Sequence, residues 1–160
     1  MNHQEPFGGN KCFTKAGLAV GTTTTLTTAN AQECMIQGKS VKKAATSNEA
    51  TPTTDYITGA AFTGVAAGKA CVFTLCRDSA GALKAIQGQI VDLVGGEIVL
   101  GPWYGPDSKD LAPIGSVLVK CATGAATWTF GSSNFSGPPS NVTFTFTDFA
   151  GGMPARPQAA

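Results

Sequence analysis

Near the C-terminus the chain reads Asn141-Val142-Thr143-Phe144-Thr145-Phe146-Thr147-Asp148-Phe149, so apolar residues alternate with threonine. Successive side chains of a β-strand point to opposite faces of a sheet, and this stretch therefore predicts a strand with one apolar face and one hydroxyl face. Threonine suits such a surface because its β-branched side chain fits a pleated, half-exposed sheet. The pattern poses one question from the start, which is whether the hydroxyl face meets water or a neighbouring subunit.

Two further stretches predict the centre of the same sheet. Lys69–Asp78 is largely apolar on both faces, which is typical of a strand buried on both sides. Ala82–Leu93 follows a turn that begins with Asp and ends with Gly, and it predicts the returning strand, interrupted at Gly88.

Other segments predict turns, loops and a further strand. Ala31–Ala45 predicts a hairpin with Gly38-Lys39 as its two-residue turn. Thr46–Thr54 is polar and contains a proline, which favours a loop. Ala125–Gly131 predicts a strand, because a tryptophan and a phenylalanine alternate there with threonines.

These elements together indicate an all-β protein. No stretch has a convincing helical period, and short strands at intervals of roughly ten residues are typical of a sandwich or barrel. We expect a single β-sandwich, jelly-roll or Greek-key-like, of about eight to ten strands over residues 11–150. Residues 1–10 are predicted to form a flexible N-terminal arm, and residues 151–160 an extended C-terminal tail.

Composition narrows the classes of partner. Charged residues make up 13% of the 160 residues and the formal net charge is +1, against a usual charged fraction of about 25%. Without clustered Lys and Arg we expect no nucleic-acid partner. No apolar stretch is long enough to span a membrane, and the N-terminus lacks the features of a signal peptide. A low charge fits either a subunit that packs against neighbours or a neutral surface rich in Thr and Ser.

Few residues of the sequence are candidates for a catalytic or metal-binding role. The single histidine, His3, lies on the predicted arm, which is a poor position for a catalytic triad. The acids are scattered, and several occur in turns where Asp is common. We therefore expect no catalytic, cofactor-binding or metal-binding residue. The five cysteines form no Cys-x-x-Cys pair, and we expect them to be reduced and buried.

Trp103 and Tyr104 stand out between two Gly-Pro pairs. Three interpretations are open: a cap on the core, a hot spot of a protein interface, or a platform for stacking sugars. Phe7 is an aromatic residue on the predicted arm, where it either starts the fold or anchors a partner. Together with Arg156 in the tail, these residues are the predicted interface with a partner or a neighbouring subunit.

Three stretches in order carry a family resemblance: Ile36–Ala45, then Ala70–Gly88, then Ala112–Lys120 with the Thr-rich segment that ends at Thr147–Phe149. Their order and spacing, over about residues 34 to 150, resemble the small virion structural proteins of tailed bacteriophages that decorate or cement the capsid surface, including head-fibre-type proteins. The usual member is richer in acids and lacks five cysteines.

The resemblance implies a non-catalytic protein without cofactors. It would be made in the cytoplasm of the host bacterium and bind the major capsid protein on the outside of the virion, as a dimer or trimer that stabilises the head. One alternative is a virion-surface module that binds carbohydrate or a host receptor through Trp103 and Tyr104. Another is a glycan hydrolase whose two carboxylates meet only in the fold.

Overall fold

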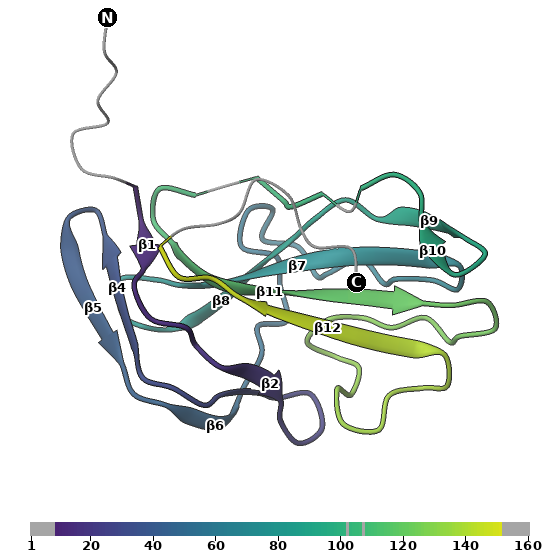
Figure 1. Ribbon diagram of the computed structural model, residues 1–160, viewed down its shortest axis with the longest axis horizontal. Coiled ribbons are helices and arrows are strands. Elements are labelled where there is room, and N and C mark those ends of the chain that lie inside the picture. Colours follow the sequence, from purple (N-terminus) through teal and green to yellow (C-terminus); the bar gives the residue numbers. More distant parts are fainter. Residues whose placement is uncertain (1–8, 102, 107, 152–160) are drawn as a thin grey trace, which may run out of the picture.

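The computed structural model describes residues 9–101, 103–106 and 108–151, and every regular element within these ranges is a β-strand (Figure 1). The all-β prediction is therefore confirmed. The strands, in chain order, are β1 (Lys11–Cys12), β2 (Leu18–Val20), β3 (Leu26–Thr28), β4 (Gln32–Ile36), β5 (Lys39–Lys43), β6 (Thr46–Glu49), β7 (Lys69–Arg77), β8 (Leu83–Gln87), β9 (Val91–Val94), β10 (Glu97–Ile98), β11 (Ala112–Cys121) and β12 (Val142–Asp148).

The largest sheet has β7 and β11 at its centre. Its strand order is β10-β9-β7-β11-β12, with β8 also paired to β7, and its pairs are antiparallel. Figure 1 shows β7, β11 and β12 as the long strands that cross the molecule side by side. β7 is buried on both faces after its first residue, which confirms the prediction for Lys69–Asp78.

β8 and β9 are consecutive partners of β7, as predicted for the interrupted strand Ala82–Leu93. Their pairing with β7 shifts by one residue between Gln87 and Val91. Gly88 lies in this step, where an added Cβ would be 2.1 Å from the carbonyl oxygen of Trp103. The step therefore requires glycine, because a contact this short forces the backbone to move.

Two smaller sheets have the orders β1-β4-β5 and β2-β3-β6. β4 and β5 form the hairpin predicted for Ala31–Ala45, but the turn is Gln37-Gly38, one residue earlier than predicted. The two turn residues have φ values of 50° and 75°, as a type I′ turn requires. Lys39 already pairs with Ile36 across the hairpin, so it belongs to the strand.

The loop predicted for Thr46–Thr54 is wrong over its first half. Thr46–Glu49 forms β6, which pairs antiparallel with β3. Its residues are exposed or half-buried, so the polar composition belongs to a strand at the edge of a small sheet rather than to a loop.

The main core lies between the large sheet and the two smaller ones. Trp128 is fully buried in it, and its indole N–H donates to the carbonyl oxygen of Asn134 at 3.1 Å. The strand predicted for Ala125–Gly131 is wrong, because Trp128 forms only an isolated bridge with Val65 and the chain then turns. Aromatic rings of β7, β12 and the loops contact one another here: Phe62, Phe73, Trp128, Phe130, Phe135, Phe144 and Phe146.

β12 divides its two faces as the alternation predicts. The apolar side packs on the main core and consists of Val142, Phe144 and Phe146. The hydroxyl face of the large sheet is only partly open to solvent, since Thr143 is exposed while Thr74 and Ser116, which pair across β7 and β11, are buried. Leu111 covers part of this face, where it packs with the buried residues Cys76 of β7 and Ile86 of β8.

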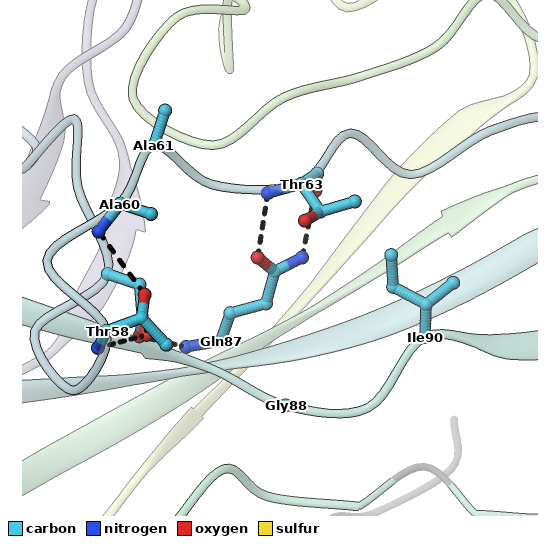
Figure 2. Close-up of a pocket in the computed structure, with 8 residues that line it drawn as sticks. Thr58, Ala60, Ala61, Thr63, Gln87, Gly88 and Ile90 are labelled. Atoms are coloured by element: carbon cyan, nitrogen blue, oxygen red, sulfur yellow. Dashed lines mark hydrogen bonds between the residues drawn. The ribbon is translucent and has the colours of Figure 1, made fainter.

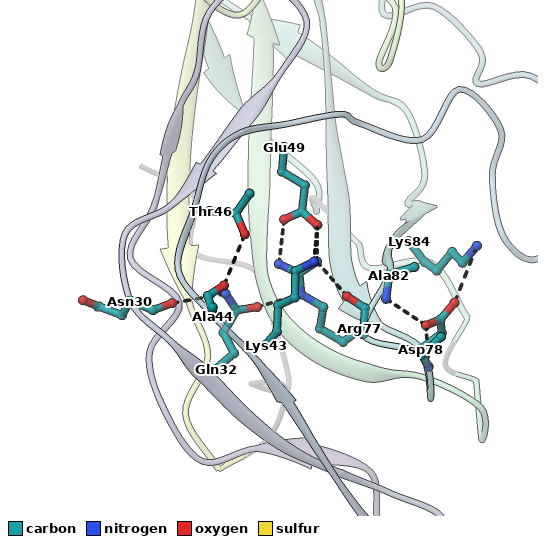
Figure 3. A network of polar contacts seen from close by, with 12 residues as sticks. Asn30, Gln32, Lys43, Ala44, Thr46, Glu49, Arg77, Asp78, Ala82 and Lys84 are labelled. Atoms are coloured by element: carbon teal, nitrogen blue, oxygen red, sulfur yellow. Dashed lines mark hydrogen bonds and ion pairs between the residues drawn. The ribbon is translucent and has the colours of Figure 1, made fainter.

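Arg77 ties β7 to both smaller sheets from a fully buried position (Figure 3). Its guanidinium donates to the two carboxylate oxygens of Glu49, on β6, at 2.6 and 2.7 Å, and its Nε donates to Oε1 of Gln32, on β4, at 2.7 Å. A further bond reaches the carbonyl of Gly81 at 3.2 Å. The planar guanidinium matches a carboxylate in this paired geometry, so one side chain fixes how three sheets meet.

Candidate interaction surface

Trp103 lies at the surface, beside the β9–β10 hairpin. Its side chain is 46% exposed, so the interpretation of Trp103 as a cap on the core is wrong. Near it lie three more exposed apolar residues, Val94, Val99 and Leu100, with exposed fractions of 63% to 76%. Together with Trp103 they surround a hollow of about 430 Å³. We call these four residues and the hollow the Trp103 surface.

The hairpin explains why this surface is apolar and uncovered. β9 turns through Gly95-Gly96, both with positive φ, into β10, which is only two residues long. The chain leaves the sheet after Ile98, so Val99 and Leu100 have no neighbouring strand on which to pack. These two apolar residues continue beyond the end of the strand and are therefore exposed to solvent.

Contacts with the connection between β8 and β9 hold Trp103 in place. The N–H of Gln89 donates to the carbonyl of Trp103 at 3.3 Å. An added Cβ on Gly101 would lie 3.1 Å from Cδ1 of the indole and 3.2 Å from a methyl of Val91, so the ring packs directly on the glycine. The indole is thus placed by the fold rather than by a long free loop.

Ion pairs border the apolar surface. Asp92 on β9 lies 2.6 Å from the ammonium of Lys69, and Glu97 on β10 lies 4.0 Å from that of Lys120. An apolar centre with a charged rim is the usual composition of a protein-binding patch. Large contiguous apolar patches on a soluble protein commonly mark such sites.

Tyr104 does not join Trp103 in a platform. Its ring packs edge-on against Phe149, with 5.9 Å between the ring centroids. Its hydroxyl is buried next to Ser116, and burial raises the pKa of Tyr104. The two neighbouring aromatic residues therefore have different roles, Tyr104 as packing for the large sheet and Trp103 as exposed surface. The other two predicted interface residues, Phe7 and Arg156, lie outside the described residues.

A second hollow, of about 490 Å³, lies next to a buried carboxylate (Figure 2). Asp55 accepts hydrogen bonds from the backbone N–H and the hydroxyl of Thr58 and from the N–H of Gln87, at 2.9 to 3.0 Å. Figure 2 shows the Gln87 amide bonded to both the N–H and the carbonyl of Thr63. These bonds hold the segment 55–63 against the edge of β8, so the buried carboxylate has a structural explanation.

The other carboxylates of the described residues are also engaged. Five of them lie in ion pairs with lysines, as in Glu33–Lys42, and one of these five, Glu49, also pairs with Arg77. Asp110 accepts from the Gln37 amide, and Asp148 accepts from the backbone N–H of Leu18. Within the described part of the chain, histidine, cysteine and acidic side chains form no group of three that could hold a metal ion. All five cysteines are buried, which confirms their predicted burial.

Sequence reasoning identified Trp103 but missed Val94, Val99 and Leu100. The available signal was the double glycine at 95–96, which limits the hairpin to a few residues and leaves the following apolar run without a strand. Comparison of the chain with protein-family models, curated proteins and solved structures found no match. Among the described residues, no helix is long and apolar enough to cross a bilayer.

Proposed function

We propose that this chain is a structural protein of a bacteriophage virion, which binds the outer surface of the capsid as a decoration or cement protein. In this proposal it is made in the cytoplasm of the host bacterium, carries no catalytic site and needs no cofactor. The observation that supports it most is the Trp103 surface, where a tryptophan and three aliphatic residues are exposed together beside the β9–β10 hairpin. Tryptophan is enriched at the energetic centres of protein interfaces.

The major capsid protein is the proposed occupant of the Trp103 surface. A cement subunit contacts capsomers that repeat over a closed lattice, so a modest contact is multiplied when each subunit bridges two sites. The low charged fraction of the chain, 13%, also favours close packing with little repulsion. The predicted arms, with Phe7 and Arg156, add further contacts in this proposal.

The proposed architecture is a β-sandwich of the jelly-roll or Greek-key type. Its support is that the main core holds residues from the large sheet on one side and from both smaller sheets on the other. An all-antiparallel sandwich of this kind suits a subunit that must be added to a particle in many copies.

Self-association is proposed to use β12, which ends the strand order of the large sheet. The N–H of Ala122 donates to the carbonyl of Asn141, so in the antiparallel ladder Thr143 and Thr145 direct their backbone groups toward β11. Phe144 and Phe146 then direct theirs outward. The strand has no proline and no charge before Asp148, the usual devices that protect an edge from pairing. Antiparallel pairing of two β12 strands about a two-fold axis gives the dimer rather than the trimer.

Capsid binding can be tested with purified protein and capsids stripped of it. Wild-type protein is expected to co-sediment with the capsids and Trp103→Ala to lose at least tenfold in affinity, since a hot-spot residue contributes about 2 kcal/mol or more. Phe13→Ala is the matched control, because Phe13 is 49% exposed but lies outside the Trp103 surface. Absence of wild-type binding, together with unchanged heat resistance of virions that lack the protein, would contradict the proposal.

The exposed indole beside a hollow also favours a second candidate, a virion-surface module that binds carbohydrate or a receptor. Sugars stack on exposed tryptophan rings, although Tyr104 points away and supplies no second ring. Binding on a glycan array that is lost in Trp103→Ala and retained in Phe13→Ala would support this candidate. An array without signal, with capsid binding intact, would leave the decoration protein as the better explanation.

A further inference from the structure

Two cysteines lie directly opposite each other in the small β1-β4-β5 sheet. Cys12 on β1 pairs with Cys34 on β4, and both side chains belong to the main core with at most 1% exposure. At the next position the N–H of Phe13 donates to the carbonyl of Glu33 at 2.8 Å. The cysteines therefore occupy the non-hydrogen-bonded position of the ladder, where facing Cα atoms are about 4.5 Å apart. That spacing lies within the range of about 4.4–6.8 Å that a disulfide spans.

The surroundings of the pair favour reaction at one sulfur. The thiol of Cys34 hydrogen-bonds to Cys12 and lowers the pKa of Cys12, while the same bond raises the pKa of Cys34. The positive charge of Arg77 lowers the pKa of Cys34. This charge helps the Cys34 thiol to ionise once Cys12 is no longer an anion. Thiolate character beside donors and cations marks reactive cysteines.

We propose that Cys12 and Cys34 form a reversible cross-strand disulfide when the folded protein meets a peroxide, and that this bond locks β1 onto β4. This inference does not depend on the proposed capsid binding. Local opening of β1, which is only two residues long, admits the small oxidant.

The chemistry is a two-electron oxidation with peroxide as the named oxidant. The Cys12 thiolate attacks one peroxide oxygen, the O–O bond breaks, and hydroxide leaves and takes up a proton to become water. Cys12 is then a sulfenic acid. Cys34 gives up its proton and attacks the Cys12 sulfur, so the S–S bond forms, the S–O bond breaks and a second water leaves. Two thiols are oxidised and one peroxide is reduced to two waters.

The other cysteines of the chain provide internal controls. Cys71 and Cys76 are both on β7. One has an odd and the other an even residue number, so their side chains lie on opposite faces of the strand and in different buried clusters. Cys121 is at the end of β11, in the main core. None of these three has another cysteine as its ladder partner. Cys71 pairs with Val119, Cys76 pairs with Lys84 and Pro113, and Cys121 pairs with Lys69 and Val142.

Peptide mapping tests the proposal on the unmodified protein. Folded protein is treated with a small molar excess of hydrogen peroxide, its remaining thiols are alkylated, and it is digested with trypsin without reductant. We expect the peptides Cys12–Lys15 and Ala16–Lys39 to appear joined, two hydrogens lighter than their sum, and to separate after reduction. The peptide Ala70–Arg77 should carry two alkyl groups. Thiols that remain alkylated at Cys12 and Cys34, or a cross-link from Cys34 to Cys76, would overturn the proposal.

Thermal unfolding gives a second, independent readout. The oxidised protein is expected to melt about 5–10 °C above the reduced protein, and dithiothreitol should reverse the shift. In Cys34→Ser the sulfenic acid on Cys12 has no resolving thiol, so it should be trapped by a dimedone probe and no shift should follow peroxide. A wild-type protein in which dimedone labels Cys12 as strongly as in Cys34→Ser would show that Cys34 does not resolve it, and would contradict the proposed pair.

Discussion

Arg77 illustrates how one residue controls the contact between sheets. Its side chain has no exposed surface, and it meets Glu49 from β6 and Gln32 from β4. A buried ion pair adds little net stability over apolar residues of the same shape, but removal of one partner leaves an uncompensated buried charge. The arginine is therefore hard to replace singly, whatever its net contribution.

Arg77→Met should lower the free energy of unfolding by about 3–5 kcal/mol, because Glu49 loses both hydrogen bonds of the pair. Urea denaturation measures this directly. The control is Lys42→Met, which breaks an ion pair with Glu33 whose side chains are 75% and 50% exposed and should cost about 0–1 kcal/mol. Equal small losses in both variants would show that the buried pair does not hold the sheets together.

Cys71 predicts a loss of stability at alkaline pH. Burial raises the pKa of its thiol from 9.0 to about 12, so between these values the unfolded chain releases a proton that the folded protein retains. The unfolded state then binds fewer protons, and stability falls as pH rises, by up to about 1.4 kcal/mol per pH unit. Between pH 9 and pH 10.5 the urea midpoint of Cys71→Ala should fall less than that of the wild-type protein. The difference between the two proteins at pH 7 gives the stability that the variant loses through its cavity. An identical fall in both proteins would contradict the assignment.

The sequence pattern predicted which residues are buried better than it predicted which residues contact one another. Lys69–Asp78 is apolar on both faces, and that alone places it at the centre of a sheet. An arginine within such a strand signals a buried partner, but Glu49 lies in a polar stretch that favours a loop. The pairing of Cys12 with Cys34 and the exposure of Trp103 depend on register and on where the hairpin stops, which a single-residue pattern does not contain.

At the scale of elements, β8 and β9 show how a break in a strand builds the candidate surface. The pairing with β7 shifts by one residue at Gly88, and the carbonyl of Trp103 then fits where a Cβ would be. Sequence predicted the interruption at Gly88 because glycine disturbs an otherwise apolar run. It did not predict that the Trp103 carbonyl occupies this space.

Gly88→Ala should destabilise the fold by about 1–3 kcal/mol, as overpacking does, since the added methyl meets the Trp103 carbonyl at 2.1 Å. Gly95→Asn is the control, because Gly95 has a positive φ that Asn tolerates and no atom within 4 Å of its Cβ position. Chemical denaturation compares the two. If both variants unfold at the wild-type denaturant concentration, the close approach of the Trp103 carbonyl to Gly88 is not required.

β12 contains the alternation of threonine and apolar residues, and it is also the strand that we propose for self-association. In the proposed dimer the outer edge of β12 pairs with a second copy, so Thr145→Lys should weaken self-association at least tenfold by placing like charges across the two-fold axis. Melting temperature should change little, since Thr145 is only half-buried. Sedimentation equilibrium measures the association. Ser79→Lys, in the exposed turn between β7 and β8, is the control and should leave the oligomer intact; equal behaviour of the two variants would argue against the β12 edge.

The whole molecule presents its candidate surfaces in different places. The Trp103 surface lies at the β9–β10 end of the large sheet, and β12 lies at the opposite edge. A subunit of this kind can bind a partner with one edge and a copy of itself with the other, which is how a small protein bridges capsomers in the proposed function. The all-β class followed from alternation and turns, whereas the arrangement of surfaces followed only from the sheet order.

In the proposed function a bacteriophage encodes the chain, and electron microscopy of the virions of that phage tests the proposal most directly. We predict copies of this fold at lattice-wide positions on the outside of the capsid, with Trp103 buried against the major capsid protein. A lattice without this density, or subunits attached with the Trp103 surface facing solvent, would contradict the account.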